Sequence, residues 1–224
     1  MAKKPIYYAS LALNVLGHYG LLVATGIPYW RKSSWQVSDP LYGRIPTFDG
    51  LWWQCMSLKT GGFTCSNYGM PTLYVDAGIQ ACRGLMTTAC VLTFFGLIIN
   101  MLVVDCSNIL GNGTKAKRSL TLAAGAMILV SWLCTLGATS FYAWQVTYQF
   151  YNPYYQEREF KYEYGPCLYV AWVSMAFLLI SGCILFFGAC KDKGDDEYDG
   201  YRYRTPRETI PSSAFDDHRK TDYV

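Results

Sequence analysis

Four long apolar segments alternate with polar segments along this chain of 224 residues. The apolar segments are residues 7–29, 81–104, 120–144 and 168–189, and no charged residue lies near the centre of any of them. A helix needs about 20 apolar residues to cross a hydrocarbon core that is about 30 Å thick. Buried helices of a soluble protein would carry charged residues on at least one face. The pattern therefore predicts four transmembrane helices.

The first apolar segment has an alternative interpretation, because it follows Lys3 and Lys4 as a secretory signal would. However, it is longer than the apolar part of a signal peptide, and it ends in Pro28-Tyr29-Trp30 without a small-residue cleavage site. We therefore expect this segment to remain in the protein as a membrane helix.

Basic residues indicate how the helices cross the membrane. They lie before the first span, between the second and third, and after the fourth: Lys3, Lys4, Lys115, Lys117, Arg118, Lys191 and Lys193. By the positive-inside rule, these three places and both termini are cytoplasmic. Basic residues in the two outer loops are matched there by acidic residues.

These spans divide the chain into nine parts. We expect a cytoplasmic N-terminus (1–6), four spans (7–29, 81–104, 120–144, 168–189), two extracellular loops (30–80, 145–167), a cytoplasmic loop (105–119) and a cytoplasmic tail (190–224).

The first outer loop has the pattern of short strands separated by turns, at Trp35–Val37, Leu51–Cys55 and Phe63–Cys65. The segment Lys59–Gly62 would reverse the chain between the last two strands, so Cys55 and Cys65 would face each other across a hairpin. On the oxidising side of a membrane, this pair predicts a disulfide. Closing such an 11-residue loop stabilises the fold by about 3 kcal/mol.

The other seven cysteines lie within or beside the expected helices, where a thiol most often packs as a small apolar group. Cys106 and Cys190 differ because each follows the cytoplasmic end of a span. For these two, packing and thioesterification with palmitate are both open interpretations.

Catalytic chemistry finds little support in the sequence. The two histidines, His18 and His218, are far apart, so they predict no catalytic triad and no metal site. No Cys-x-x-Cys pair or phosphate-binding glycine loop is present, and we expect no cofactor and no enzyme activity. The small net charge of +3 suggests no nucleic-acid partner. Asn14, His18 and Asn100 could line a transport path, but scattered polar groups more often form hydrogen bonds between helices.

A set of residues in and around the first loop resembles the signature of the claudin family. Its members here are Trp30, then Gly50, Leu51 and Trp52, then Cys55 and Cys65, then Arg83. The segments 150–154 and 161–165, and the final Tyr223-Val224, are also similar to claudin motifs. Calcium-channel γ subunits share the tryptophan, the Gly-Leu-Trp and the two cysteines, but the second loop and the C-terminus favour claudins.

The resemblance implies an α-helical membrane protein: a left-handed four-helix bundle with a small extracellular antiparallel β-sheet. Four strands of the sheet would come from the first loop and one from the second. The implied function is assembly into tight-junction strands that control ion flow between cells, with cis and trans contacts to itself and to other claudins. Phe150, Tyr151 and Pro153 would form a loop tip that makes the trans contact. An auxiliary subunit of an ion channel on the same fold is the alternative.

Ion selectivity in the family is set by charge in the first loop, and here the sequence departs from cation-conducting members. Leu58 and Ser66 stand where some of them carry acids, Lys59 follows, and only Asp49 keeps an acid. This suggests a barrier or a weakly anion-preferring pore, although Lys59 and Asp49 could equally be ordinary solvated residues.

The tail from Lys191 onward is polar and acidic, and we expect it to be disordered. Its last residues, Tyr223 and Val224, are the exception. A free carboxylate after an apolar side chain suits the groove of a PDZ domain, so a junctional PDZ scaffold is an expected partner.

Overall fold

A computed structural model describes residues 4–33, 46–58, 61–68, 76–109, 115–152 and 161–202 of the chain. Its described elements are the helices α1 (Lys4–Gly26), α2 (Ala77–Ile109), α3 (Lys115–Tyr151) and α5 (Pro166–Arg202), and the strands β1 (Arg31–Ser33), β2 (Thr47–Asp49), β3 (Trp53–Ser57), β4 (Phe63–Asn67) and β5 (Tyr162–Tyr164).

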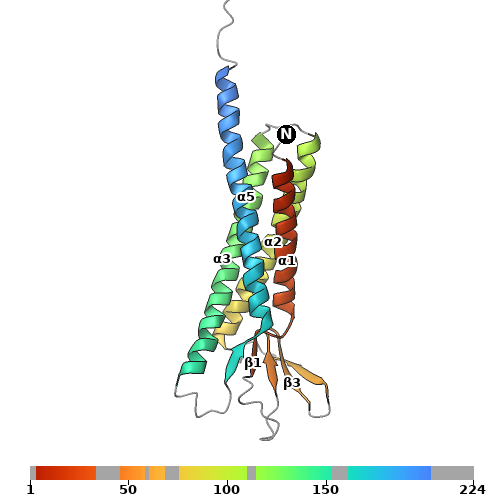
Figure 1. The fold of residues 1–224 in the computed structure, drawn as a ribbon, viewed down its shortest axis with the longest axis vertical. Helices are drawn as coiled ribbons and strands as arrows, with labels where there is room; N and C mark the ends of the chain where they lie inside the picture. The colour runs from red at the N-terminus through yellow and green to blue at the C-terminus, as the bar shows by residue number, and fades with distance from the viewer. Residues whose placement is uncertain are drawn as a thin grey trace, which may run out of the picture.

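The four helices form an elongated bundle, with the strands gathered at one end and the N-terminus at the other (Figure 1). All four are long and apolar enough to cross a membrane. An isolated strand cannot pair its backbone groups in lipid, so long apolar segments of this kind fold as helices. The predicted membrane bundle with a small antiparallel sheet is confirmed.

Two helices extend well past the expected spans, which corrects two predictions. Helix α3 reaches Tyr151, so Phe150 and Tyr151 lie in its last turn rather than in a loop tip. Helix α5 reaches Arg202, so the tail is helical for its first part rather than disordered throughout. Once a helix has formed, each further residue that is fixed adds one hydrogen bond without the cost of a new nucleus. The next prolines, which end helices, come only at Pro153 and Pro206.

The sheet has the strand order β4-β3-β2-β1-β5, and each neighbouring pair is antiparallel. The predicted hairpin is confirmed: Cys55 lies opposite Cys65, and Gly61 and Gly62 take positive φ angles of 78° and 132° in its turn. Strand β3 begins and ends two residues later than the strand expected at Leu51–Cys55. Strand β4 ends two residues later than the one expected at Phe63–Cys65. The strand expected at Trp35–Val37 lies outside the described residues.

Hydrogen bonds between helices supplement the packing of small and apolar side chains in the bundle. The Ser10 and Ser181 hydroxyls lie 3.0 Å apart, and His18 Nδ1 lies 2.9 Å from the Thr93 hydroxyl. His18 therefore makes the interhelical contact that is typical of polar groups in membranes. Asn14 and Asn100 are fully buried, yet their amide atoms have no hydrogen-bond partner among the described residues.

This contrast predicts opposite effects at two neighbouring positions of α1. The change Asn14→Leu keeps the number and branching of the side-chain heavy atoms and removes a buried amide, so the thermal unfolding midpoint in detergent should stay the same or rise. The change Ser10→Ala removes a hydrogen bond to Ser181 and should cost about 0.6 kcal/mol. A larger loss of stability in Asn14→Leu than in Ser10→Ala would show that the Asn14 amide is hydrogen-bonded after all.

Candidate functional site

Trp30 anchors the sheet to the bundle just beyond the end of α1. Its side chain is completely buried, and its indole Nε1 donates a hydrogen bond to the Ala24 carbonyl oxygen at 2.6 Å. The ring meets that of Tyr142 on α3 edge to face, with centroids 5.0 Å apart. The backbone N–H of Trp30 donates to the backbone carbonyl oxygen of Asp49 at 3.0 Å. One tryptophan thus joins α1, α3 and β2.

Gly50 lets the first loop return to the end of α1. A Cβ atom built at this position would lie 2.4 Å from Pro28 Cα, which is closer than real Cβ atoms approach backbone. The Gly50 N–H donates to the Trp53 carbonyl at 2.9 Å and so forms the tight turn between β2 and β3. Leu51 follows with 1% exposure. A glycine is required here because no side chain fits against the proline.

Arg83, near the end of α2 that faces the sheet, holds the same turn from the other side. Its Nε donates to the Leu51 carbonyl oxygen at 2.6 Å. Its guanidinium lies 5.1 Å from the ring centroid of Trp52 and 5.2 Å from that of Tyr68. The arginine therefore binds a loop carbonyl, one of the structural roles that its position at the mouth of a span allows. Trp30, Gly50, Leu51, Trp52 and Arg83 all meet at this junction of sheet and bundle.

A buried ion pair crosses the sheet beside the junction. Arg31 Nε lies 2.8 Å from Asp49 Oδ2, and the Asp49 side chain has no exposed surface. Burial alone would lower the pKa of Arg31, but the negative charge of Asp49 beside it helps to raise the pKa, so the guanidinium stays charged. Arg31 also lies 4.2 Å from the ring centroid of Tyr162.

The buried pair corrects the interpretation of Asp49 as a charge that faces the pore or is solvated. Its carboxylate is enclosed on the sheet face that meets α3, where Arg31 Nη1 also donates to Gln149 at 3.4 Å. Breaking such a pair by removing one partner costs about 3–5 kcal/mol. Asp49 therefore belongs to the structure of the loop and not to its exposed charge.

The opposite face of the sheet carries the disulfide and an exposed ion pair. Cys55 and Cys65 are bonded, as the sequence predicts. In the register of the sheet, Lys32 and Glu163 lie on this same face, 3.8 Å apart and both well exposed. Leu58 and Ser66 are exposed at the β3–β4 hairpin, while Lys59 lies outside the described residues.

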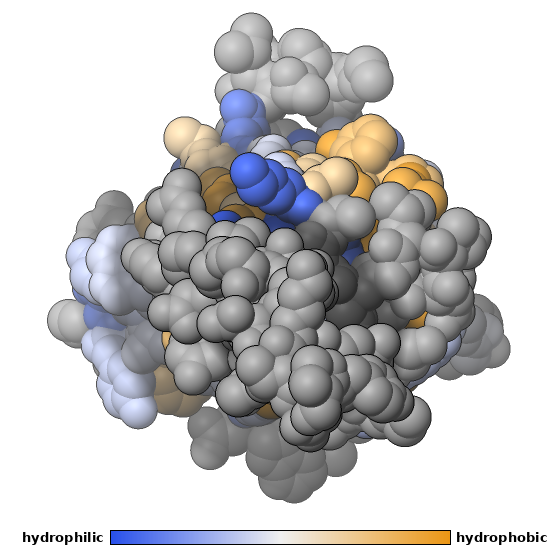
Figure 2. Space-filling model, turned by 90° about the horizontal axis from the view of Figure 1, so that it is seen from above, coloured by the Kyte–Doolittle hydropathy of each residue, from blue (hydrophilic) through white to orange (hydrophobic). Residues whose placement is uncertain are grey.

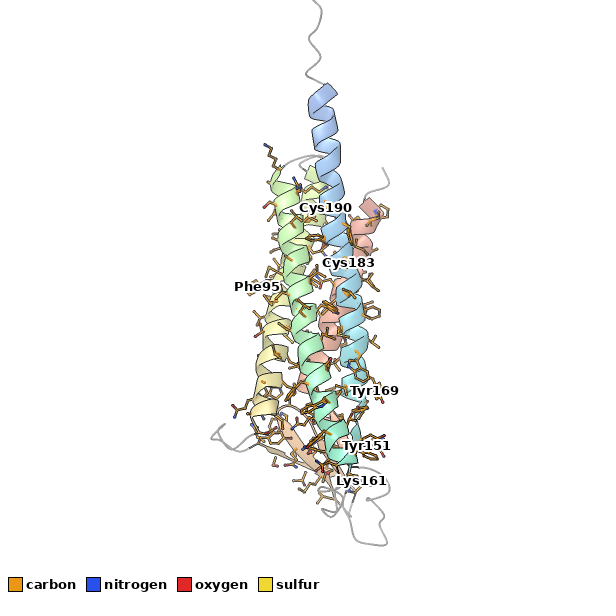
Figure 3. All side chains as sticks on the ribbon, turned by 90° about the vertical axis from the view of Figure 1, so that its left-hand side faces the viewer. Phe95, Tyr151, Lys161, Tyr169, Cys183 and Cys190 are labelled. Carbon is orange, nitrogen blue, oxygen red and sulfur yellow. A yellow bond between two sulfur atoms is a disulfide. The ribbon has the colours of Figure 1, made fainter. Side chains whose placement is uncertain are left out.

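An aromatic groove runs between the last turns of α3, strand β5 and the start of α5, with a volume of about 480 Å³. Figure 3 shows Tyr151 and Tyr169 at this end of the bundle. Tyr151 is 73% exposed, although it is a large apolar ring. The groove is lined by Lys32, Val146, Thr147, Phe150, Tyr151, Tyr162, Glu163, Tyr164 and Tyr169.

Other expected site residues lie apart from this region or outside the described residues. Cys190 is exposed on α5 near the end of the bundle opposite the sheet, where Figure 3 shows it. The side chain of Cys106 is not among those described. Pro153, Tyr223 and Val224 also lie outside the described residues.

Arg31, Tyr142 and Gln149 belong to the junction, but the sequence alone did not single them out. Arg31 follows Trp30 directly, so its place next to a signature residue was the available signal. Tyr142 and Gln149 are seven residues apart on α3, two helical turns that place them on one face. Only the contact with β1 and β2 shows that this face meets the sheet.

The close approach of Gly50 to Pro28 predicts that Gly50→Ala is destabilising. The added methyl group meets backbone rather than a flexible side chain, so the turn must move, at a cost of about 1–3 kcal/mol. The matched control is Gly84→Ala on α2, where an added Cβ meets nothing within 4 Å. Thermal unfolding followed by tryptophan fluorescence measures both, and equal midpoints would refute the steric argument.

Comparison with known proteins agrees with this architecture. The family model described as PMP-22/EMP/MP20/Claudin matches residues 7–185. Claudin-15 of Bos taurus is 34% identical over 187 residues, which cover 81% of this chain and 77% of the relative. Claudin-19 of Mus musculus is 32% identical over 184 residues (79% and 81%), and Claudin-7 of Homo sapiens is 30% identical over 224 residues, the full length of both chains. The chain therefore belongs to the claudin family.

Proposed function

We propose that this protein polymerises into tight-junction strands through cis and trans contacts and so controls the passage of ions between cells. The observation that carries the proposal is the exposed aromatic groove at the end of α3, next to a disulfide-bonded sheet. Tyr151 keeps most of its ring in the open, which is costly unless another protein covers it. Aromatic residues are also enriched where proteins bind one another.

The orientation proposed from the basic residues agrees with the chemistry of the two ends. The sheet end holds a disulfide, which forms and persists outside the cell. The other end holds the start of α3 with Lys115, Lys117 and Arg118. Viewed from that end, hydrophilic residues are visible among apolar side chains (Figure 2). We assign the sheet to the extracellular side and both termini to the cytoplasm.

The trans contact is assigned to the groove rather than to a loop tip alone. Phe150 and Tyr151 end a rigid helix, and their rings meet edge to face with centroids 5.2 Å apart. Lys161 places its ammonium 5.2 Å from the ring centroid of Phe150. A preformed rim of this kind loses little side-chain entropy on binding, so it suits contact with a second copy or another claudin.

Two cytoplasmic roles complete the proposal. The exposed thiol of Cys190 lies on α5 at the end of its membrane span, where palmitate could attach and enter the lipid. Cys106 has the corresponding place on α2. The C-terminal Tyr223-Val224 is proposed to bind a PDZ scaffold through its carboxylate and its apolar last side chain.

We propose that the strands form either a barrier or a pore that weakly prefers anions. Asp49 is neutralised by Arg31, and the exposed Lys32 is matched by Glu163. A charge in physiological salt acts over about 8 Å, so local charge decides which ions pass. Lys59 is then the candidate that remains in the hairpin, because Leu58 and Ser66 carry no charge.

The trans contact is tested by the double change Phe150→Ala and Tyr151→Ala. In cells that lack tight junctions, the unchanged protein should form strand networks at contacts between expressing cells, and the double variant should reach the surface without matched strands. Tyr148→Ala, which removes an exposed ring outside the groove, is the control and should form normal strands. Normal strands in the double variant would refute the contact. Altered gating of a co-expressed channel without strands would favour the auxiliary-subunit role.

Selectivity is tested by the dilution potential across a monolayer. The unchanged protein should show no strong cation preference, and Lys59→Asp should shift the potential toward cations because it replaces a positive charge by a negative one. Lys59→Arg keeps the charge and should leave the potential unchanged. A strong cation preference that Lys59→Asp does not alter would mean that Lys59 does not face the pore.

A further inference from the structure

Four polar side chains at the junction of sheet and bundle have buried atoms that bind nothing in the described part of the chain. These atoms are Asp49 Oδ1, Arg83 Nη2 and the hydroxyl oxygens of Tyr68 and Tyr142. Burying a polar group without a hydrogen bond is destabilising, and burying an incompletely paired charge is more so. Four such atoms at one junction therefore require an explanation.

The four side chains come from four elements and converge. Asp49 lies on β2, Tyr68 just after β4, Arg83 on α2 and Tyr142 on α3. The Arg83 guanidinium lies 5.2 Å from the ring centroid of Tyr68, and Asp49 interacts electrostatically with both tyrosine hydroxyls. Buried polar groups that converge without a direct hydrogen bond are the kind that a bridging water joins.

The four atoms differ in whether they donate or accept hydrogen bonds, and this limits which small molecule can bridge them. The free oxygen of Asp49 can only accept a hydrogen bond, and Arg83 Nη2 can only donate one. Burial raises the pKa of Tyr68 to about 12, and the charge of Asp49 adds to this, so its hydroxyl is neutral and can do both. An anion would be repelled by Asp49, and a cation by Arg31 and Arg83. Of these three candidates, only water can donate to Asp49 and accept from Arg83.

We propose that ordered water fills a closed polar chamber between the sheet and the bundle and bridges Asp49, Tyr68, Arg83 and Tyr142. A buried water needs two to four polar partners, and this site supplies them. The water bridges would hold the sheet at a fixed angle to the helices, in addition to the Trp30 and Gly50 contacts. The inference rests on the junction alone and is independent of strand formation.

The first test compares two reagents on the full-length protein in detergent. Hydroxyl radicals generated by brief X-ray exposure arise from bound water, so Tyr142 should be oxidised although it is only 2% exposed. Ile128 and Leu178, which are fully buried in the apolar core, should show no comparable oxidation after correction for their intrinsic reactivity. N-acetylimidazole is too large to enter, so it should acetylate the exposed Tyr151 and leave Tyr142 unmodified.

Two results of this test would overturn the proposal. Absence of Tyr142 oxidation above the level of Ile128 and Leu178 would show that the chamber is dry. Acetylation of Tyr142 would show that the chamber is open to solvent and holds no trapped water.

The second test uses the sign of a stability change. If the Tyr142 hydroxyl binds water, Tyr142→Phe leaves that water and its other partners short of a hydrogen bond, and the unfolding midpoint should fall. If the hydroxyl is dry and unpaired, its removal relieves a desolvation cost, and the midpoint should stay the same or rise. Tyr148→Phe, at a hydroxyl-bearing residue that is 52% exposed, is the control and should change nothing. An unchanged or raised midpoint in Tyr142→Phe would contradict the proposal.

Discussion

Two glycines pack their backbones against the segment that follows the first helix, and the rest of the sheet end of the molecule depends on this contact. A Cβ atom at Gly50 would lie 2.4 Å from Pro28 Cα, and one at Gly165 would lie 2.0 Å from the Tyr29 carbonyl oxygen. The loop between α1 and α2 and the loop between α3 and α5 therefore both rest their backbones on residues 28–30. The N–H groups of Gly165 and Cys167 donate to the carbonyls of Trp30 and Tyr29. Because both loops meet this one short segment, β5 from the second loop lies beside β1 from the first.

Buried polar groups have different kinds of partners in the helix bundle and at the junction of sheet and bundle. In the bundle, small hydroxyl residues such as Ser10, Ser181 and Thr93 bond across helices or to their own backbone, because lipid offers no alternative partner. At the junction, each charged group has at least one partner: Asp49 is buried against Arg31, and the half-buried Arg83 binds the Leu51 carbonyl and two aromatic rings. The atoms of these groups that have no partner among the described residues are those for which we propose bridging water.

The sequence predicts the four helices because uninterrupted apolar segments of this length have one stable form in lipid. It predicts the β3–β4 hairpin because two glycines and a cysteine pair mark it. It does not predict where α3 ends, since Trp144 marks the edge of the hydrocarbon but nothing stops the helix before Asn152-Pro153. It also misplaces Asp49, because a single acid in a polar loop looks solvated. Its burial depends on Arg31, Tyr142 and Gln149, which only the folded chain brings together.

The burial of Asp49 changes how charge selectivity should be argued for this chain. In the sheet register, Arg31, Asp49 and Tyr164 share one face, while Lys32 and Glu163 share the other. On the first face, the charges pair and are shielded from solvent; on the second, they pair and are exposed. The opposite charges of each pair largely cancel at distances well beyond their own separation, and salt screens the remaining field over about 8 Å. Counting charged residues in the first loop therefore says little about its exposed charge, because a paired charge contributes little farther out. In this chain, the acid next to Gly-Leu-Trp is paired with Arg31 and fully buried, so it adds little to that exposed charge.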